Sequence, residues 1–295
     1  MTLLTLLPVV LDDGVIKNPF ASDPAARRPS VTRTIPRSLA PVIAELELEA
    51  ADLVTTAKLD EILKAAGVGT ATRTVASRLR ERGWLLPTGQ RGVWEFAPGA
   101  AAGAVSRGGH TRLLRSSLAH GYLNCGLTFQ AAAWAHDLAD RAPVRLEVAA
   151  MTAHEARKLP DGLDVSVFAP RLEYVTLQGV PVLAPASVLV QMAAQPGDVR
   201  SWTSALEWLP DLAAEAVAQD VLTELQGRPT TVAARLGYLV QALRPDIADQ
   251  VTRPGTKTWF GPRQTLVRHD NYWQIADTLL PFDPRSLASV AGAVT

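Results

Sequence analysis

Four arginines stand within ten residues of one predicted helix, and a fifth follows at the tip of a predicted hairpin. The stretch 69–99 reads GTATRTVASRLRERGWLLPTGQRGVWEFAPG, with arginines at 73, 78, 80, 82 and 91. Arginine donates bidentate hydrogen bonds to guanine O6 and N7 and to phosphate oxygens, and serine and threonine hydroxyls also bind phosphate. These residue types therefore predict contact with a nucleic acid.

The helical period separates these polar residues from an apolar face. At about 100° per residue, Val75 and Leu79 point inward, whereas Arg73, Ser77 and Arg80 point outward. A helix in the major groove needs long donors along its outer face, and its N-terminus attracts phosphate. The predicted DNA contacts are Thr70, Thr72, Arg73, Thr74, Ser77, Arg78 and Arg80 on the helix, and Gln90 and Arg91 on the hairpin. The alternative interpretation is a solvated helix face.

The surrounding segments have the order of a winged helix-turn-helix. We expect Ser38 to cap a first helix whose apolar stripe is Leu39, Val42, Ile43 and Leu46. A second helix is expected from Thr56 to Gly67, and a third from about 70 to 82, ended by Gly83. Strand formers at 84–86 and 93–96 flank the turn sequence PTGQRG. The sequence thus predicts a winged helix over residues 38–104.

Charge is distributed unevenly along the chain. The net charge of the 295 residues is zero, yet residues 68–115 contain eight arginines and two glutamates. Residues 116–295 contain 14 basic and 18 acidic residues. Such an asymmetry indicates a polyanion as the partner of the basic segment.

Two further basic segments carry weaker predictions. Within the predicted arm or linker of residues 1–37, the part 17–37 is rich in Pro, Ser and Ala. Four arginines there either reach a minor groove or belong to a plain linker: Arg27, Arg28, Arg33 and Arg37. A second basic segment, residues 253–268, contains no acidic residue. Its basic side chains contact either DNA backbone or a partner, or they belong to a structured loop: Arg253, Lys257, Arg263 and Arg268.

The remainder, residues 105–295, alternates helix and strand signals and predicts a larger mixed α/β domain. Helices are expected over 124–139, from Pro185 to Met192, over 202–226 with a kink at Pro210, over 231–245, and near 272–280. Strands are expected at 144–149, 163–168, 174–177 and 180–183, the last two as a hairpin. The predicted fold class is α+β.

Neither catalytic nor metal-binding spacing occurs in the sequence. There is no HExxH, no Gly-x-Ser-x-Gly and no Asp-x-Asp at Asp161 and Asp164, so we expect no enzyme activity, metal or cofactor. The single cysteine, Cys125, fits a reducing compartment. No run of about 20 apolar residues is present, and the start MTLLTLLPVVLDDG lacks a basic n-region. These features predict a cytoplasmic protein without a membrane partner.

The order of segments resembles the AbiEi-type antitoxins of bicistronic type IV toxin–antitoxin systems, and points to a mycobacterial member. Over about residues 38–280 the resemblance is carried by RGVWEFAPG, GLTFQAAAWAHDL, GVPVLAPASVLVQMA and AARLGYLVQAL. It implies a winged helix that binds inverted repeats in its own promoter, which favours two copies on the DNA, and represses the operon. It also implies a C-terminal domain that counteracts a nucleotidyltransferase-like toxin, with or without direct binding.

Two other functions remain open on the sequence. One is a transcriptional regulator whose C-terminal domain senses a small molecule. The other is a nucleic-acid-modifying enzyme that uses the winged helix for targeting, which needs a convergent acidic or metal site. Rescue of growth from a toxic neighbouring gene would distinguish the antitoxin from both.

Overall fold

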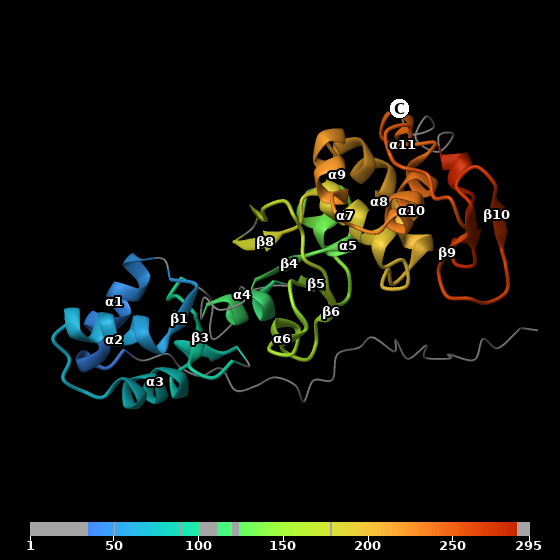
Figure 1. Cartoon of the computed structure of the whole chain (residues 1–295). Helices are drawn as coiled ribbons and strands as arrows, with labels where there is room; N and C mark the ends of the chain where they lie inside the picture. Colours follow the sequence, from blue (N-terminus) through green and yellow to red (C-terminus); the bar gives the residue numbers. More distant parts are fainter. Residues whose placement is uncertain are drawn as a thin grey trace, which may run out of the picture.

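The chain packs around two separate hydrophobic cores. The computed structural model describes residues 35–49, 51–88, 90–100, 111–119, 124–177 and 179–287. One core lies within residues 39–96 and the other within residues 114–287. Figure 1 shows the first as a small body of α1–α3 and β1–β3 and the second as a larger body, with α4 between them. Residues 1–34, which include Arg33 and most of the predicted N-terminal arm, lie outside the described residues.

The small body is a three-helix unit closed by a three-stranded sheet. Its elements are η2 (Arg37–Leu39), α1 (Ala40–Leu48), β1 (Leu53–Thr55), α2 (Thr56–Ala65), α3 (Thr72–Glu81), β2 (Leu85–Pro87) and β3 (Val93–Phe96). The sheet has the order β1-β3-β2, and both pairings are antiparallel. The predicted three helices followed by a hairpin are confirmed, and the apolar stripes of all three helices are buried.

One local expectation for this unit was wrong, and one of its strands was not predicted. Ser38 does not cap α1, because a 3₁₀ turn precedes the helix and Leu39 occupies the N-cap position without a side-chain hydrogen bond. Strand β1 was missed, because three residues with one buried side chain, Val54, carry no alternating pattern. The predicted start of α2 is confirmed, and the Thr55 hydroxyl caps it by accepting the N–H of Lys58 at 3.1 Å.

The larger body contains a mixed sheet of five strands in the order β6-β5-β4-β8-β7. Its strands are β4 (Cys125–Leu127), β5 (Glu147–Ala150), β6 (Asp164–Val167), β7 (Val175–Leu177) and β8 (Val180–Val182). Strand β5 is antiparallel to β4 and parallel to β6, and β8 is parallel to β4 and antiparallel to β7. The four predicted strands and the β7–β8 hairpin are present with shifted ends.

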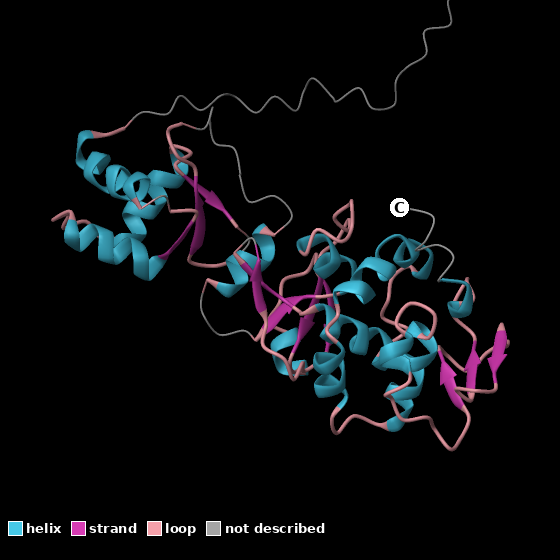
Figure 2. Ribbon diagram, turned by 90° about the horizontal axis from the view of Figure 1, so that it is seen from above, coloured by secondary structure: helices cyan, strands magenta, loops and turns pink. Residues whose placement is uncertain are grey.

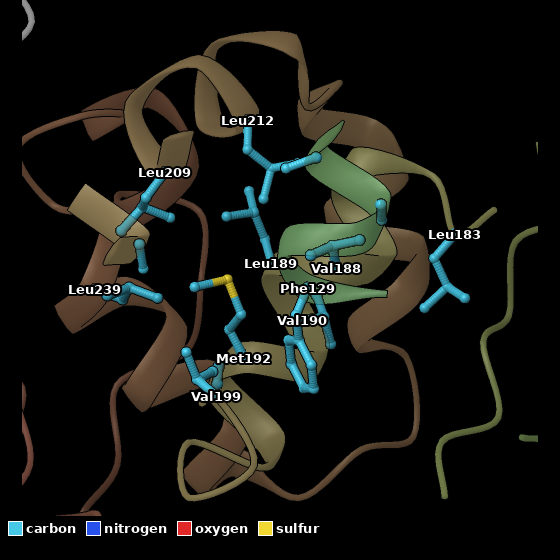
Figure 3. Packing of buried hydrophobic residues seen from close by; sticks show 14 of the residues in the cluster. Phe129, Leu183, Val188, Leu189, Val190, Met192, Val199, Leu209, Leu212 and Leu239 are labelled. Atoms are coloured by element: carbon cyan, nitrogen blue, oxygen red, sulfur yellow. The ribbon is translucent and has the colours of Figure 1, made fainter. Parts of the chain in front are cut away.

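The helices of the larger body form a layer beside this sheet, in which α5 and α6 contact β4–β6 and the helices α8–α10 pack around α7 (Figures 1 and 2). The helices of this body are α4 (Arg112–Leu118), α5 (Phe129–Ala135), α6 (Ala153–Ala156), α7 (Pro185–Ala194), α8 (Trp202–Glu215), α9 (Ala218–Leu225), α10 (Thr230–Val240) and α11 (Pro245–Ala248). Helix α7 is central, since all residues from Ala186 to Ala193 are buried. Figure 3 shows its Leu189 and Met192 among Leu209, Leu212 and Leu239 from α8 and α10.

Three predicted helices of this body need correction. The segment 124–139 begins as strand β4 and becomes helical only at Phe129. The long helical segment breaks between α8 and α9 at Ala216–Val217, whereas Pro210 lies inside α8. The expected final helix near 272–280 is instead a turn and strand β11 (Ile275–Asp277), which pairs with β9 (Thr258–Phe260) and β10 (Arg268–Asp270); a 3₁₀ turn, η3 (Pro284–Ser286), follows.

In the described part of the chain, no helix has both the length and the hydropathy that a membrane crossing requires.

Candidate nucleic-acid interface

A groove of about 890 Å³ lies between α3 and the β2–β3 hairpin. Its α3 side is lined by Arg73, Ser77 and Arg80, and its hairpin side by Gln90 and Arg91. The two segments that the sequence analysis singled out for DNA contact therefore face one hollow. The inward side of α3, Val75 and Leu79, is fully buried in the core, which fixes the side that α3 turns outward.

Three arginines of α3 point into solvent. Arg73, Arg78 and Arg80 are exposed, and among the residues that the structure describes their side chains have no hydrogen-bond or ion-pair partner. Guanidinium groups in this state are ready to bind an external acceptor, because no internal contact has to be broken first. The groove is consequently a concave surface with available positive charge.

Other predicted contacts already have partners within the protein. The Thr72 hydroxyl donates to Asp60 Oδ1 at 2.8 Å, and the Ser77 hydroxyl donates to Glu81 Oε1 at 3.1 Å. Lys64 and Thr72 lower the pKa of Asp60, so this carboxylate stays charged as an acceptor. Thr72 thereby ties the start of α3 to α2, and the exposed hydroxyls of Thr70 and Thr74 lie beside it.

The turn of the hairpin is attached to α2. The carbonyl oxygen of Gly92 accepts both the N–H of Thr56 at 2.9 Å and its hydroxyl at 3.2 Å. Gly92 has φ of +77°, and a Cβ there would lie 2.8 Å from Thr56 Oγ1. Only glycine therefore fits this turn without strain. Thr56, whose role has no signal in the sequence, thereby holds in place the turn that carries Arg91 on the hairpin side of the groove.

Two arginines counted in the basic segment do not face the groove. Arg112 Nη1 lies 3.6 Å from Glu95 Oε2, and Arg115 forms an ion pair with Asp52. Both acids belong to the small body and both arginines to α4. The basic segment of the sequence thus contains two kinds of arginine. Those on α3 are exposed, and those on α4 form ion pairs that join the two bodies.

The second predicted basic set lies at the opposite end of the molecule from α3, as both ribbon views show. Arg253 stacks on Tyr272 at 4.0 Å, and Lys257 lies 5.0 Å from the ring centre of Trp259. Arg263 is exposed, whereas Arg268 pairs with the buried carboxylate of Asp277. These residues, like the exposed Arg37 on η2, are not continuous with the groove, so a DNA contact through them stays a separate prediction.

A smaller hollow of about 370 Å³ lies in the larger body, where Glu147, Asp164, Asp198 and Arg200 line it. Glu147 Oε2 accepts the N–H of Ala131 at 3.1 Å. Burial raises the pKa of Glu147 to about 7, against the lowering effect of this backbone hydrogen bond. Phe129 also lines the hollow and has φ of +45°, which is rare for a large side chain.

The raised pKa of Glu147 predicts a pH-dependent stability. The folded state holds this proton more tightly than the unfolded state, so stability falls as pH rises from 4.5 to about 7. Relative to Glu147→Gln, the wild-type free energy of unfolding should decrease by up to about 3 kcal/mol over this range. Urea unfolding of both proteins at a series of pH values measures this difference. The same pH dependence of the unfolding free energy in both proteins would contradict a raised pKa of Glu147.

The described residues contain no group of three or more His, Cys, Asp or Glu side chains arranged to hold a metal ion.

Comparison with known proteins gives two findings. Residues 124–242 match the sequence profile of the AbiEi antitoxin C-terminal domain. The fold is similar to the crystal structure of the RV2827C protein from Mycobacterium tuberculosis, with 25% identity and a TM-score of 0.70, over 90% of this chain and 98% of that one. No curated protein matches the chain.

Proposed function

We propose that this chain, whose residues 124–242 resemble the AbiEi antitoxin C-terminal domain, is a DNA-binding antitoxin that represses its own toxin–antitoxin operon. The domain match supports the antitoxin role. The observation that carries the DNA-binding role is the groove in which Arg73 and Arg80 of α3 face Gln90 and Arg91 of the hairpin. The toxin that it counteracts would be a separately encoded, nucleotidyltransferase-like protein, and no enzyme activity is proposed for the chain itself.

We propose a division of labour between two domains, a winged helix over residues 38–104 and an antitoxin domain over residues 105–295, preceded by an arm. The two separate hydrophobic cores support this division, because each body has its own buried cluster. An operator as partner implies a cytoplasmic location.

In the proposed complex, α3 lies in the major groove of a duplex. The groove is about 12 Å wide and admits one helix. Arg73, near the N-terminus of α3, reads a base edge; Arg78 and Arg80 extend along the helix; Gln90 and Arg91 contact phosphate. Inverted repeats place two copies on one operator, each with its α3 in a half-site.

The role of the hairpin gives a prediction that differs from that of α3. Arg91→Ala should weaken binding to an operator duplex and to a scrambled duplex by similar factors, because phosphate contacts carry no sequence information. Fluorescence anisotropy at several salt concentrations measures both affinities, and the slope of log K against log salt should become shallower by roughly one. A loss confined to the operator would assign Arg91 to base reading instead.

The whole proposal is tested with the upstream DNA and the neighbouring gene. The expected results are that wild-type protein binds a duplex containing the inverted repeats more tightly than a scrambled one, and that co-expression restores growth of cells carrying the toxic neighbour. Absence of sequence preference at moderate salt would overturn the repressor role, and absence of rescue would overturn the antitoxin role.

One observation favours the alternative of a regulator that senses a small molecule. The hollow beside Glu147 combines carboxylates and a guanidinium with a strained residue, Phe129, and strained residues cluster at ligand sites. A compound bound there would raise the melting temperature of the protein, lose this effect in Glu147→Gln and change operator affinity. A metabolite screen without any such shift would leave the antitoxin as the function.

A further inference from the structure

Helix α4 connects the two bodies through its two faces. Its apolar residues belong to the larger body: Leu114 is fully buried in that core, and Leu113 and Leu118 pack against it. Its polar residues Arg112, Arg115 and Ser117 contact the small body instead. Helix α4 therefore links the two bodies, because it packs in the core of one and forms polar contacts with the other.

Three side chains of α4 contact the small body, at two places beside its sheet. Arg115 pairs with Asp52, directly before β1. Arg112 lies 3.6 Å from the carboxylate of Glu95 on β3, which is only 1% exposed. Gln90, in the turn of the hairpin, donates a hydrogen bond from Nε2 to Ser117 Oγ at 3.3 Å. The first two contacts lie side by side, because Leu53 pairs with Glu95 across β1 and β3, and the third lies beyond the other end of β3. Contacts at both ends of β3 restrict rotation of the small body, whereas a single ion pair would leave a hinge.

The contact at Gln90 lies next to a residue of the proposed DNA interface. Gln90 and Arg91 are neighbours in one turn, and both line the groove. The Gln90 side chain nevertheless donates to α4, so the turn that presents Arg91 is held from the side of the larger body. Arg115 also lies close to the larger body, because a Cβ on Gly179 in the β7–β8 turn would be 3.7 Å from its Nε.

We infer that α4 is a clamp that sets the orientation of the winged helix, and that Asp52 and Arg115 are positioning residues for operator binding. The inference rests on the proposed function for its DNA readout only. Two copies on one operator must place two α3 helices in half-sites of fixed spacing, and a body that swings freely lowers the fraction of molecules in that arrangement. Asp52 and Arg115 touch neither the groove nor, in the proposed complex, the duplex.

Charge-removing substitutions on both sides of the ion pair, of which Asp52→Asn is isosteric, separate the clamp from simple electrostatics. Asp52→Asn removes a negative charge, which by Coulomb attraction alone would raise affinity for DNA. The clamp predicts the reverse: Asp52→Asn and Arg115→Gln each lower affinity for the two-half-site operator roughly five- to tenfold, within the usual range of coupling between sites. The double variant should lose no more than either single variant, because both break the same contact. Arg157→Gln, an exposed arginine on the C-terminal side of α6, is the control for Arg115→Gln, because it makes the same charge change.

A second readout needs no DNA. Ala65→Cys on α2 and Asp211→Cys on α8 are exposed positions for spin labels, while the native Cys125 is buried and burial raises its thiol pKa to about 12. Electron–electron distance measurements should give one narrow distribution in the wild-type background and a broader one with Arg115→Gln. An unchanged distribution, or a gain of operator affinity in Asp52→Asn, would overturn the clamp. If the wild-type protein binds no operator, the proposed function fails while the distance measurement still decides the clamp.

Discussion

Replacing Arg73 and Arg80 together by alanine is expected to weaken binding to the operator duplex at least about 30-fold, a loss of roughly 2 kcal/mol or more. Both side chains line the groove and are exposed, and within the described residues neither has an internal partner. Their contribution to folding is therefore small, and the loss falls on binding. Arg73, as the proposed base reader, should account for about 1–3 kcal/mol of discrimination between operator and scrambled duplexes.

The control for this experiment removes two arginines elsewhere. Arg141 and Arg157 are exposed on the larger body, so their double alanine variant changes the net charge equally. Anisotropy titrations with operator and scrambled duplexes compare the two variants. Similar losses in both would mean that total charge alone governs binding, and equal losses of Arg73→Ala on the two duplexes would refute its base-reading role.

The second large effect is expected on stability, at Glu224 in α9. This side chain is fully buried, forms an ion pair with Arg228, and accepts the Ser187 hydroxyl at 3.0 Å. It also accepts the backbone N–H groups of Arg171 at 2.9 Å and Leu172 at 3.2 Å. Glu224→Ala removes the acceptor of the buried Ser187 hydroxyl and of the partly buried N–H groups, and it takes the carboxylate partner from Arg228. The free energy of unfolding of the larger body should therefore fall by about 3–5 kcal/mol.

Hydrogen exchange resolved by segment distinguishes the two bodies. The Glu224→Ala variant should exchange faster across residues 163–240 and unchanged across residues 40–96, if each core is stable by itself. Glu215→Ala, at an exposed position at the end of α8, is the matched control and should leave both regions as they are. Faster exchange across the winged helix as well would contradict the proposed division into independently stable domains.

The three helices and the hairpin of the small body could be predicted because their signals are local. The stripes Leu59–Ile62–Leu63 and Val75–Leu79 repeat with the helical period, and Gly67 and Gly83 end their helices with φ of +65° and +71°. The outward face of α3 then follows from geometry alone. The groove could not be predicted in the same way, because it also depends on the position of the hairpin relative to α3. That position is fixed by the hydrogen bond between Thr56 and Gly92, which are 36 residues apart in the sequence.

What was missed depends on contacts between distant segments. Strand β4 reads as helix locally, but Gly126 packs under the ring of Tyr174, where a Cβ would lie 2.7 Å from the ring. Arg268 looks like a free basic residue, yet its guanidinium pairs with Asp277, which also accepts the Tyr238 hydroxyl at 3.0 Å. The pairing of Arg115 with Asp52 likewise has no local signature, so the arginines of α4 could not be separated from those of α3.

Site-directed photo-crosslinking tests most directly whether α3 lies in a duplex groove. Cys125 is buried, so Ser77→Cys offers one reactive thiol on the outer face of α3 for a photoreactive group, and Asp211→Cys offers one on α8 as the control. If α3 lies in a duplex groove, the label at 77 crosslinks to defined positions within each inverted repeat and the label at 211 does not. Crosslinks from α8 alone, or crosslinks from α3 spread evenly along any duplex, would contradict this placement of α3.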